Sequence, residues 1–198
     1  MTALVLGLII FFSVHSVRIV ADDFRTRQIE KVGVNTWRGM YSAVSIAGIV
    51  LIVVGYGAAR GAPQVVWYPP VWLMHAAILL TVASFILIAA GFVPGTRIRS
   101  KVGHPMMLGI KVWALAHLMA NGMLADVILF GTFLIWSVAA YTSARRRDRK
   151  VGTVYVVGPP TRDAIAIIGG LVAWAAFAMW LHRLLIGVSP LQIAAAAG

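Results

Sequence analysis

Long apolar runs alternate with short polar or basic segments along nearly the whole chain. A helix that crosses a bilayer takes about 20 mostly apolar residues at about 1.5 Å each. Six runs approach that length, and they cover residues 3–20, 39–57, 71–92, 105–120, 124–141 and 164–186. The pattern predicts an all-α, polytopic membrane bundle of about six transmembrane helices, folded as one domain over residues 1–198.

The boundaries of these runs carry helix and turn signals. Pro69-Pro70 precedes the third run, and Pro105 opens the fourth, where proline favours the start of a helix. Asn121-Gly122 is a strong turn dipeptide, so the fourth and fifth helices are expected to form a tight antiparallel hairpin. The fourth run is the shortest and contains Lys111.

The amino-acid composition excludes several other classes of protein. The chain is 61% hydrophobic and 12% charged, with a mean hydropathy of +0.89. Soluble domains are about 45–50% apolar and about 25% charged, so a soluble enzyme, a disordered chain and a coiled coil are excluded. The absence of cysteine excludes structural disulfides, cysteine-ligated zinc and iron–sulfur clusters.

The net charge of +11 indicates how the chain is oriented in a bilayer and does not indicate binding to nucleic acid. With six spans, fourteen of the seventeen Lys and Arg residues fall on the side opposite the two termini, thirteen in the loops and Arg18 at the end of the first run. The positive-inside rule assigns those loops to the cytoplasm. Both termini are therefore expected on the opposite side of the membrane, which is the periplasm if the source is a Gram-negative bacterium. The first run is expected to be a retained helix, because its basic residues follow it, whereas those of a signal peptide precede it. The small, apolar tail at residues 187–198 is expected at the outer surface.

Two histidines lie near the middle of the predicted membrane, where a titratable side chain is a functional hypothesis by default. His15 lies 12 residues after Ala3, about 18 Å from the outer face at 1.5 Å per residue. His117 lies 12 residues after Pro105, about 18 Å from the inner face. Their depths differ by roughly 6 Å in a core about 30 Å thick.

A pair of imidazoles at matched depth on two helices suits axial ligation of haem iron between helices of a bundle. Trp113, one turn before His117, would line the macrocycle, and basic side chains near the inner face would neutralise the propionates. The candidates for that role include Arg38, Arg99 and Lys111. The alternative is that each histidine makes an interhelical hydrogen bond and that Trp113 is a packed core residue.

The remaining titratable groups favour structural roles. His75 and His182 are expected as polar tips near the outer boundary, and His104 as the cap of the fourth helix. Asp126 would pair with His75 or His117, or stay an exposed carboxylate at a helix start. The chain has no Walker-type loop, zinc helix or nucleophile-elbow motif.

The stretch at residues 103–131, GHPMMLGIKVWALAHLMANGMLADVILFG, resembles the signature of the NnrU family. His15-Ser16 and the segment Arg38-Gly39-Met40-Tyr41-Ser42 are similar to it as well. The resemblance implies an integral inner-membrane protein with a role in bacterial denitrification, in the reduction of nitrite and nitric oxide. NnrU proteins are similar to 15-cis-ζ-carotene isomerases, which carry haem b. The resemblance implies that His15 and His117 ligate that haem.

Two departures from those relatives matter. Plant isomerases have a cysteine three residues before the second histidine, where this chain has Ala114, so a thiolate ligand is excluded. Many relatives read Arg-His-Pro and Asn-Gly-Asp where this chain reads Gly103-His104-Pro105 and Asn121-Gly122-Met123. Arg99 or Lys101 is the expected substitute for the missing arginine, and Asp126 for the missing aspartate.

Three functions remain open. The first is a haem-b protein that supports nitrogen-oxide respiration alongside the reductase machinery. The second is a haem-dependent carotenoid cis–trans isomerase, and the third is a structural membrane protein without a cofactor. The expected partners are the lipid bilayer and either the nitrogen-oxide reductases or a carotenoid, but no nucleic acid.

Overall fold

The computed structural model describes residues 1–192, and the last part of the apolar tail, residues 193–198, lies outside the described residues. Apart from one isolated bridge between Val65 and Met123, the regular secondary structure of the described part is helical. Within residues 1–192, five helices are long and apolar enough to cross a membrane. The protein is therefore all-α and has the features of a multi-pass membrane protein, as the sequence predicts.

All six predicted spans are helical, with shifted ends. They correspond to α1 (Thr2–Val20), α3 (Val34–Arg60), α4 (Val71–Phe92), α6 (Pro105–Ala120), α7 (Leu124–Val151) and α8 (Thr161–Ala176) with its continuation. α6 has only 16 residues and is not among the five long helices. At 1.5 Å per residue it is about 24 Å long, shorter than a hydrocarbon core of about 30 Å.

Polar segments that were expected as loops are also helical. α2 (Asp22–Val32) and α5 (Arg97–Val102) are additional short helices, α3 begins at Val34 rather than Gly39, and α7 continues through the basic run to Val151. Backbone hydrogen bonds within a helix need no apolar side chains, so a helix continues past the stretch that hydropathy marks. The 28 residues of α7 span about 42 Å, which is longer than the hydrocarbon core.

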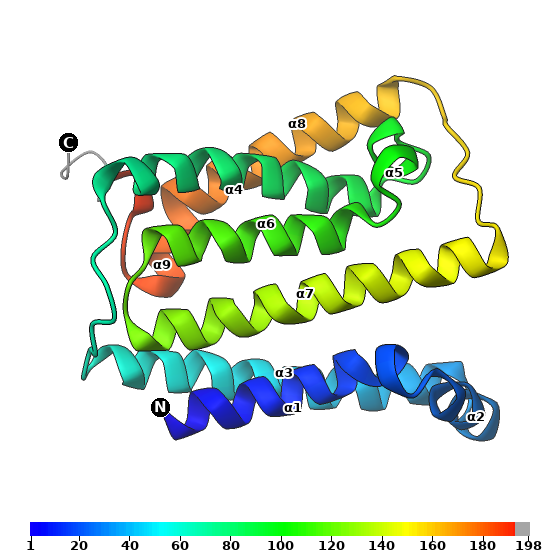
Figure 1. The fold of residues 1–198 in the computed structure, drawn as a ribbon, viewed down its shortest axis with the longest axis horizontal. Helices are drawn as coiled ribbons and strands as arrows, with labels where there is room; N and C mark the ends of the chain where they lie inside the picture. The colour runs from blue at the N-terminus through cyan, green and yellow to red at the C-terminus, as the bar shows by residue number, and fades with distance from the viewer. Residues whose placement is uncertain (193–198) are drawn as a thin grey trace. The chain divides into compact units, whose positions relative to one another are not determined.

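The chain divides into two compact units, and α7 begins in the first and continues in the second. Unit 1 comprises residues 1–66 and 123–132, and unit 2 comprises residues 67–122 and 133–198. In unit 1, α1 and α3 pack antiparallel in direct contact, and α2 joins them at one end (Figure 1). Gly48 and Gly55 lie directly against the α1 backbone at Phe11 and Leu4. An added Cβ would collide there, so glycine permits the close approach.

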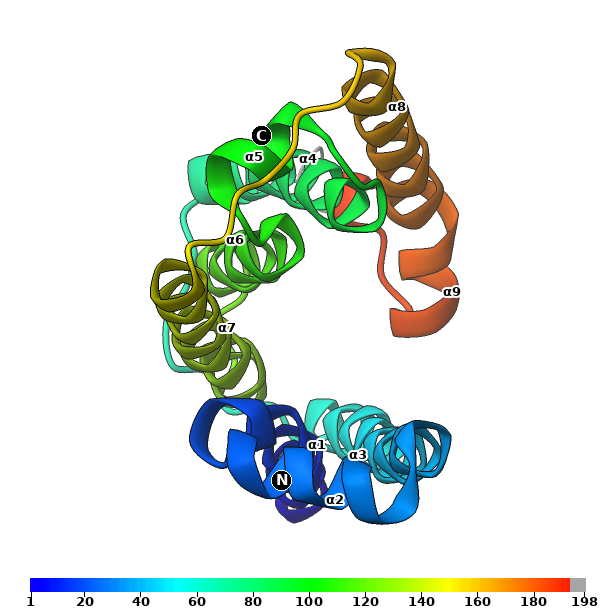
Figure 2. The same ribbon diagram turned by 90° about the vertical axis from the view of Figure 1, so that its right-hand side faces the viewer.

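In unit 2, α4 packs against α6 on one flank and α8 on the other (Figure 2). The hydroxyl of Ser84, fully buried on α4, donates to the carbonyl of Gly109 on α6 over 2.8 Å. Gly170 of α8 lies against the backbone of Ile86. α8 continues through a π-helical segment, Phe177–Leu181, into α9 (His182–Ile186).

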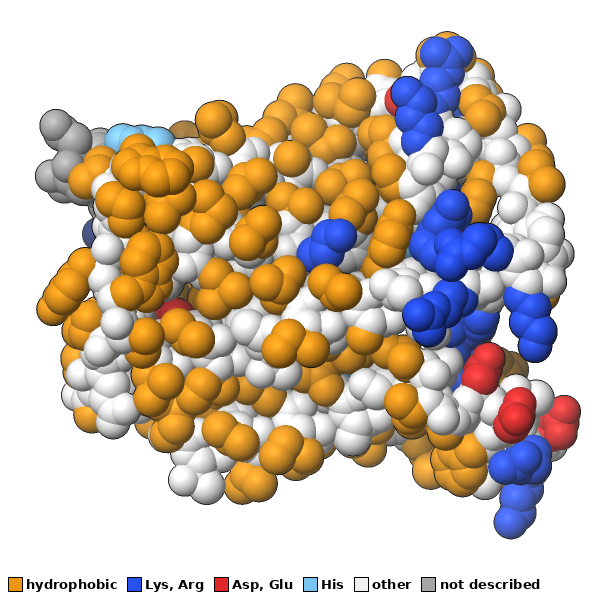
Figure 3. All heavy atoms as spheres, viewed as in Figure 1, with side chains coloured by type: hydrophobic (Ala, Val, Ile, Leu, Met, Phe, Trp, Pro, Cys, Tyr) orange, Lys and Arg blue, Asp and Glu red, His pale blue; other side chains and the backbone are white. Residues whose placement is uncertain are grey.

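Apolar side chains cover much of the outer surface of both units. Ile9 of α1, Leu79 of α4 and Ile135 of α7 are 60%, 72% and 74% exposed. Exposed apolar side chains on long apolar helices are what a surrounding lipid phase requires. Within unit 2, Lys and Arg side chains gather at the end where α5 and the C-terminal turns of α7 lie (Figure 3).

Candidate functional site

His15 lies near the C-terminal end of α1 and is half-buried in unit 1. Its Nδ1 is 2.7 Å from the carbonyl oxygen of Phe11, one turn earlier. The imidazole stacks on the Phe11 ring at 3.9 Å between centroids, and the Tyr41 ring of α3 lies 5.0 Å away. A carbonyl oxygen only accepts, so Nδ1 carries the hydrogen and Nε2 carries the ring's lone pair.

His117 repeats this arrangement in unit 2. Its Nδ1 is 2.8 Å from the carbonyl oxygen of Trp113, and the Trp113 ring lies 4.8 Å from the imidazole centroid. The side chain of Asn121 caps the end of α6 by donating to the carbonyl of His117 over 2.8 Å. Asn121 therefore ends α6 at the predicted turn, and its side chain contacts the His117 backbone.

This hydrogen bond has a chemical consequence for both histidines. Ligating histidines in proteins characteristically donate the second ring N–H to a carbonyl or a carboxylate, which fixes the tautomer and the ring orientation. His15 and His117 each hold the Nδ1-protonated tautomer in this way. Each presents Nε2 as the nitrogen suited to an iron ligand, so the donor chemistry of both fits haem.

A pocket of about 130 Å³ lies beside His117, within unit 2. Its walls come from α4, α6, α8 with its continuation, and the segment after α9, and they are mostly apolar or aromatic. The aromatic and polar residues in the lining are Thr81, Phe85, Trp113, His117, Asn121, Trp174, Phe177 and His182. The indole of Trp174 donates to the Thr81 hydroxyl over 3.0 Å, which ties α8 to α4 beside the cavity.

Trp113 forms one wall of this pocket. Besides its contact with His117, its ring meets the Phe133 ring of α7 edge-on at 5.4 Å. The predicted neighbourhood of Trp113 and His117 is therefore present, and Trp113 is also packed against another helix.

His182 reaches the same pocket, which the sequence did not indicate. Its Nδ1 is 2.8 Å from the carbonyl oxygen of Val188, so it too holds the Nδ1-protonated tautomer. It directly follows the π-helical segment, and such segments frequently occur at functional sites. A local widening of the helix leaves no mark in the hydropathy pattern, so the orientation of His182 could not be read from the sequence.

The three basic residues predicted to face a cofactor lie outside the described lining of this pocket. The Nζ of Lys111 lies 5.5 Å from the Tyr141 ring centroid, and the guanidinium of Arg99 lies 5.9 Å from that of Tyr155. Arg38 is exposed near the start of α3, in unit 1. Lys111 and Arg99 each make a cation–π contact, which orients the charge without neutralising it.

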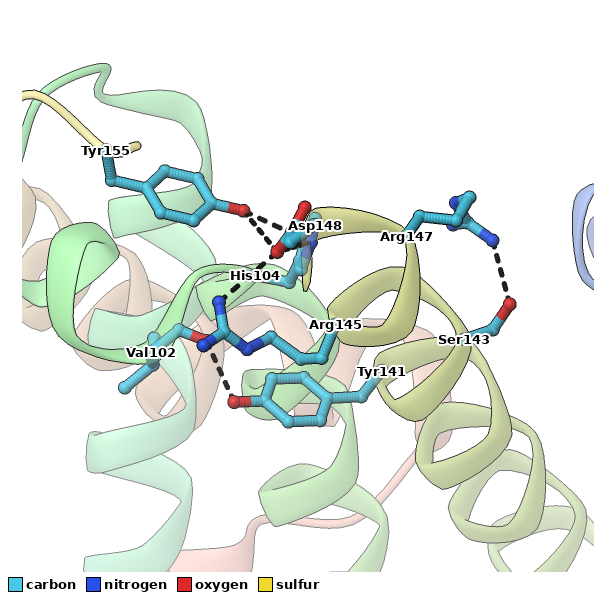
Figure 4. Close-up of polar contacts among 8 residues, drawn as sticks. All are labelled: Val102, His104, Tyr141, Ser143, Arg145, Arg147, Asp148 and Tyr155. Carbon is cyan, nitrogen blue, oxygen red and sulfur yellow. Dashed lines mark hydrogen bonds and ion pairs between the residues drawn. The ribbon is translucent and has the colours of Figure 1, made fainter. Parts of the chain in front are cut away.

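A polar cluster occupies the basic end of unit 2 (Figure 4). The Asp148 carboxylate accepts from Tyr155 at 2.7 Å, from His104 Nε2 at 3.0 Å and from Arg145 at 3.2 Å. Tyr141 donates to the carbonyl of Val102 over 2.8 Å. Partial burial, and then the hydrogen bond to the Asp148 carboxylate, raise the pKa of Tyr155. The cluster ties the α5–α6 junction to the end of α7 and to the segment before α8.

Comparison with known protein families shows which family the chain belongs to. The model of the family described as NnrU protein matches residues 3–190, nearly the whole chain. The chain belongs to the NnrU family. No curated protein and no solved structure matches this NnrU protein in the corresponding searches.

Two polar residues of this NnrU protein differ from their expected roles. His104 stands at the N-cap position of α6, but its side chain makes no cap hydrogen bond and contacts Asp148 instead. Asp126 is buried rather than exposed, and it accepts from the Tyr56 hydroxyl and from the backbone N–H of Met123. A single sequence does not reveal either partner, because Tyr56 and Asp148 are distant along the chain.

Proposed function

We propose that this NnrU protein binds haem b through His15 and His117 and supports nitrogen-oxide respiration in the bacterial inner membrane. The observation that carries the proposal is the shared Nδ1–H to carbonyl hydrogen bond, which fixes the ligating tautomer of both imidazoles. Haem bound there would supply a redox-active iron. Membership of the NnrU family supports the respiratory role.

The chain's own residues would hold and tune that group. Phe11 stacks on one imidazole and Trp113 lies beside the other, so both rings are restrained by an aromatic neighbour as well as by a hydrogen bond. Arg38 and Lys111 are the proposed partners of the propionates, because Arg99, the third candidate from the sequence, lies against Tyr155 at a separate hollow. The position of the isomerases' cysteine is taken by Ala114, which is fully buried and has no ligating atom.

An absorption spectrum of the purified full-length protein, expressed with a haem supply, tests the ligands. We expect a Soret band and the sharp visible bands of a six-coordinate, low-spin haem. His15→Ala and His117→Ala should each lose the low-spin bands or the haem itself. His75→Ala is the matched control, because His75 is exposed on α4. Unchanged spectra in both ligand variants would refute the proposal, and a sample that stays colourless after reconstitution with haem would favour the cofactor-free structural protein.

The respiratory role needs a separate test in cells. A deletion strain of a denitrifying host should consume nitrite and nitric oxide more slowly than the parent. The intact gene should restore consumption, and the His15→Ala and His117→Ala genes should not, whereas the His75→Ala gene should. Normal consumption in the deletion strain would remove this role while leaving the haem proposal standing.

The pocket beside His117 favours a second candidate, a haem-dependent carotenoid isomerase. Its walls are mainly apolar and aromatic, as the binding of part of a polyene requires. Co-expression with tri-cis-ζ-carotene, followed by chromatography, tests this function. Accumulation of the isomerised product only with the intact gene would support it, and an unchanged isomer profile would exclude it for this substrate.

A further inference from the structure

A second hollow, of about 370 Å³, lies in unit 2 between the α4–α5 connection and the segment that leads into α8. Two segments far apart in the chain form it, and the backbone N–H of Gly158 joins them by donating to the carbonyl of Gly95 over 2.8 Å. The lining residues are Pro94, Gly95, Thr96, Arg99, Ser100, Val154, Tyr155, Val156 and Arg162. The hollow is separate from the pocket beside His117, with which it shares no lining residue.

Two guanidinium groups give this hollow its charge. Arg162 is held by a hydrogen bond to the carbonyl of Pro94 at 3.1 Å and by packing against Gly95 and Gly158. Arg99 is held against the ring of Tyr155. Within residues 1–192 neither forms an ion pair with a carboxylate. The nearby Asp163 carboxylate accepts instead from the backbone N–H groups of Arg97 and Ile98, at 3.2 Å each.

The position of the hollow indicates where its ligand would come from. α4 ends at Phe92 and α8 begins at Thr161, and both helices belong to candidate membrane spans. The hollow therefore lies where two membrane helices end, at the depth of lipid headgroups. Its rim is apolar, because Val154 and Val156 are 84% and 79% exposed and Phe92, two residues before the hollow, is 73% exposed.

We propose that this hollow binds the phosphate of an anionic phospholipid headgroup. A guanidinium matches phosphate by paired, charge-assisted hydrogen bonds, and basic pockets between membrane helices bind anionic headgroups. The exposed rim would meet the acyl chains of the same lipid. A free phosphate ion would use the two arginines but gain nothing from the rim, so the rim favours a lipid over a soluble anion.

Native mass spectrometry of the full-length protein in detergent tests this proposal. The protein is titrated with phosphatidylglycerol, with phosphatidylcholine and with inorganic phosphate. We expect phosphatidylglycerol to bind at least about tenfold more tightly than the other two, because the two arginines repel the choline cation of phosphatidylcholine and inorganic phosphate has no acyl chain to meet the rim. Equal binding of the two lipids would overturn the proposal, and so would inorganic phosphate that binds as tightly as phosphatidylglycerol.

Matched variants locate the site. Arg99→Gln with Arg162→Gln should weaken phosphatidylglycerol binding about tenfold, whereas Arg146→Gln with Arg149→Gln removes the same charge from exposed positions and should change it little. Val154→Ser with Val156→Ser should weaken lipid binding while keeping both arginines. Equal losses in the two arginine pairs would indicate nonspecific attraction and overturn the assignment. The preference of the unaltered protein between the two lipids stays decisive if a variant fails to fold. None of these measurements depends on haem.

Discussion

At the scale of single residues, three histidines make the same kind of hydrogen bond to a backbone carbonyl. His15, His117 and His182 each place Nδ1 within 2.8 Å of a backbone carbonyl oxygen. For His15 and His117 that carbonyl is one helical turn earlier, so the helix itself selects the tautomer. The sequence separates His15 and His117 from the other histidines by depth, and only the structure adds His182 to this group. His75 is exposed, and His104 contacts Asp148 through Nε2.

Asp148 carries a prediction at this scale. Replacing it with alanine leaves His104, Arg145 and Tyr155 without their common acceptor, so Asp148→Ala should lower the free energy of unfolding by about 1–3 kcal/mol. Thermal or denaturant unfolding in detergent, followed by circular dichroism, measures the change. Glu30→Ala is the control, because Glu30 is exposed on α2. Equal stability of the two variants would show that the cluster contributes little.

At the scale of helices, some glycines lie at a contact between two helices and others do not. Gly48, Gly55 and Gly170 lie against the backbone of a neighbouring helix, whereas Gly57 and Gly169 have no atom within 4 Å of the position a Cβ would take, apart from their own helix and chain neighbours. All five lie inside apolar runs, so the sequence alone does not separate the first three from the last two. Helix face and register decide which glycine meets a partner.

Gly55 and Gly57 make a matched test of that distinction. An alanine Cβ at Gly55 would collide with the backbone of Leu4, so Gly55→Ala should destabilise the α1–α3 pair by about 1–3 kcal/mol. Gly57→Ala meets open space and should change stability little or raise it by up to about 1 kcal/mol, because alanine favours helix. Thermal unfolding of both variants in the same detergent gives the comparison. A Gly55→Ala protein at least as stable as Gly57→Ala would contradict the close packing.

At the scale of the whole molecule, the distribution of basic residues predicts the topology. In unit 1, Arg25, Arg27 and Lys31 lie on α2, at the end of the α1–α3 pair, and in unit 2 the basic side chains gather around α5 and the end of α7 (Figure 3). If α6 crosses the membrane, six spans place both termini on the side opposite these residues. The length of α6 makes this the point to test, because a helix of about 24 Å needs local thinning of the bilayer.

The absence of cysteine makes that test direct, because each introduced thiol is the only one. We expect an impermeant maleimide to label Ala62→Cys and Ser189→Cys in right-side-out vesicles. Thr26→Cys and Thr153→Cys should react only in inverted vesicles, which expose the cytoplasmic face. If Ala62→Cys and Ser189→Cys react from opposite sides, an odd number of spans separates them and α6 does not cross. Labelling of both Thr26→Cys and Thr153→Cys from outside would reverse the predicted orientation, whereas labelling of Thr153→Cys alone from outside would again indicate that α6 does not cross.

The sequence by itself determined the helical class, the approximate spans and the places of the basic segments. Backbone polar groups cannot stay unpaired in lipid, so long apolar runs must be helical, and charged side chains must collect where those runs end. The sequence also identified Trp113 and His117 as neighbours, because residues four apart share a helix face. These features depend only on local order along the chain.

Only the tertiary structure decided which distant groups meet. His182, directly after the π-helical segment, lies at the pocket of His117, and Arg162, in the first turn of α8, lies at the hollow of Arg99. The fold also buries Asp126 beside Tyr56. The partners of Asp126 and Asp148 and the glycines that permit contact depend on helix register. Register is set by how whole faces pack against one another, and apolar runs that are hydrophobic on all sides give no local signal of which face will be buried.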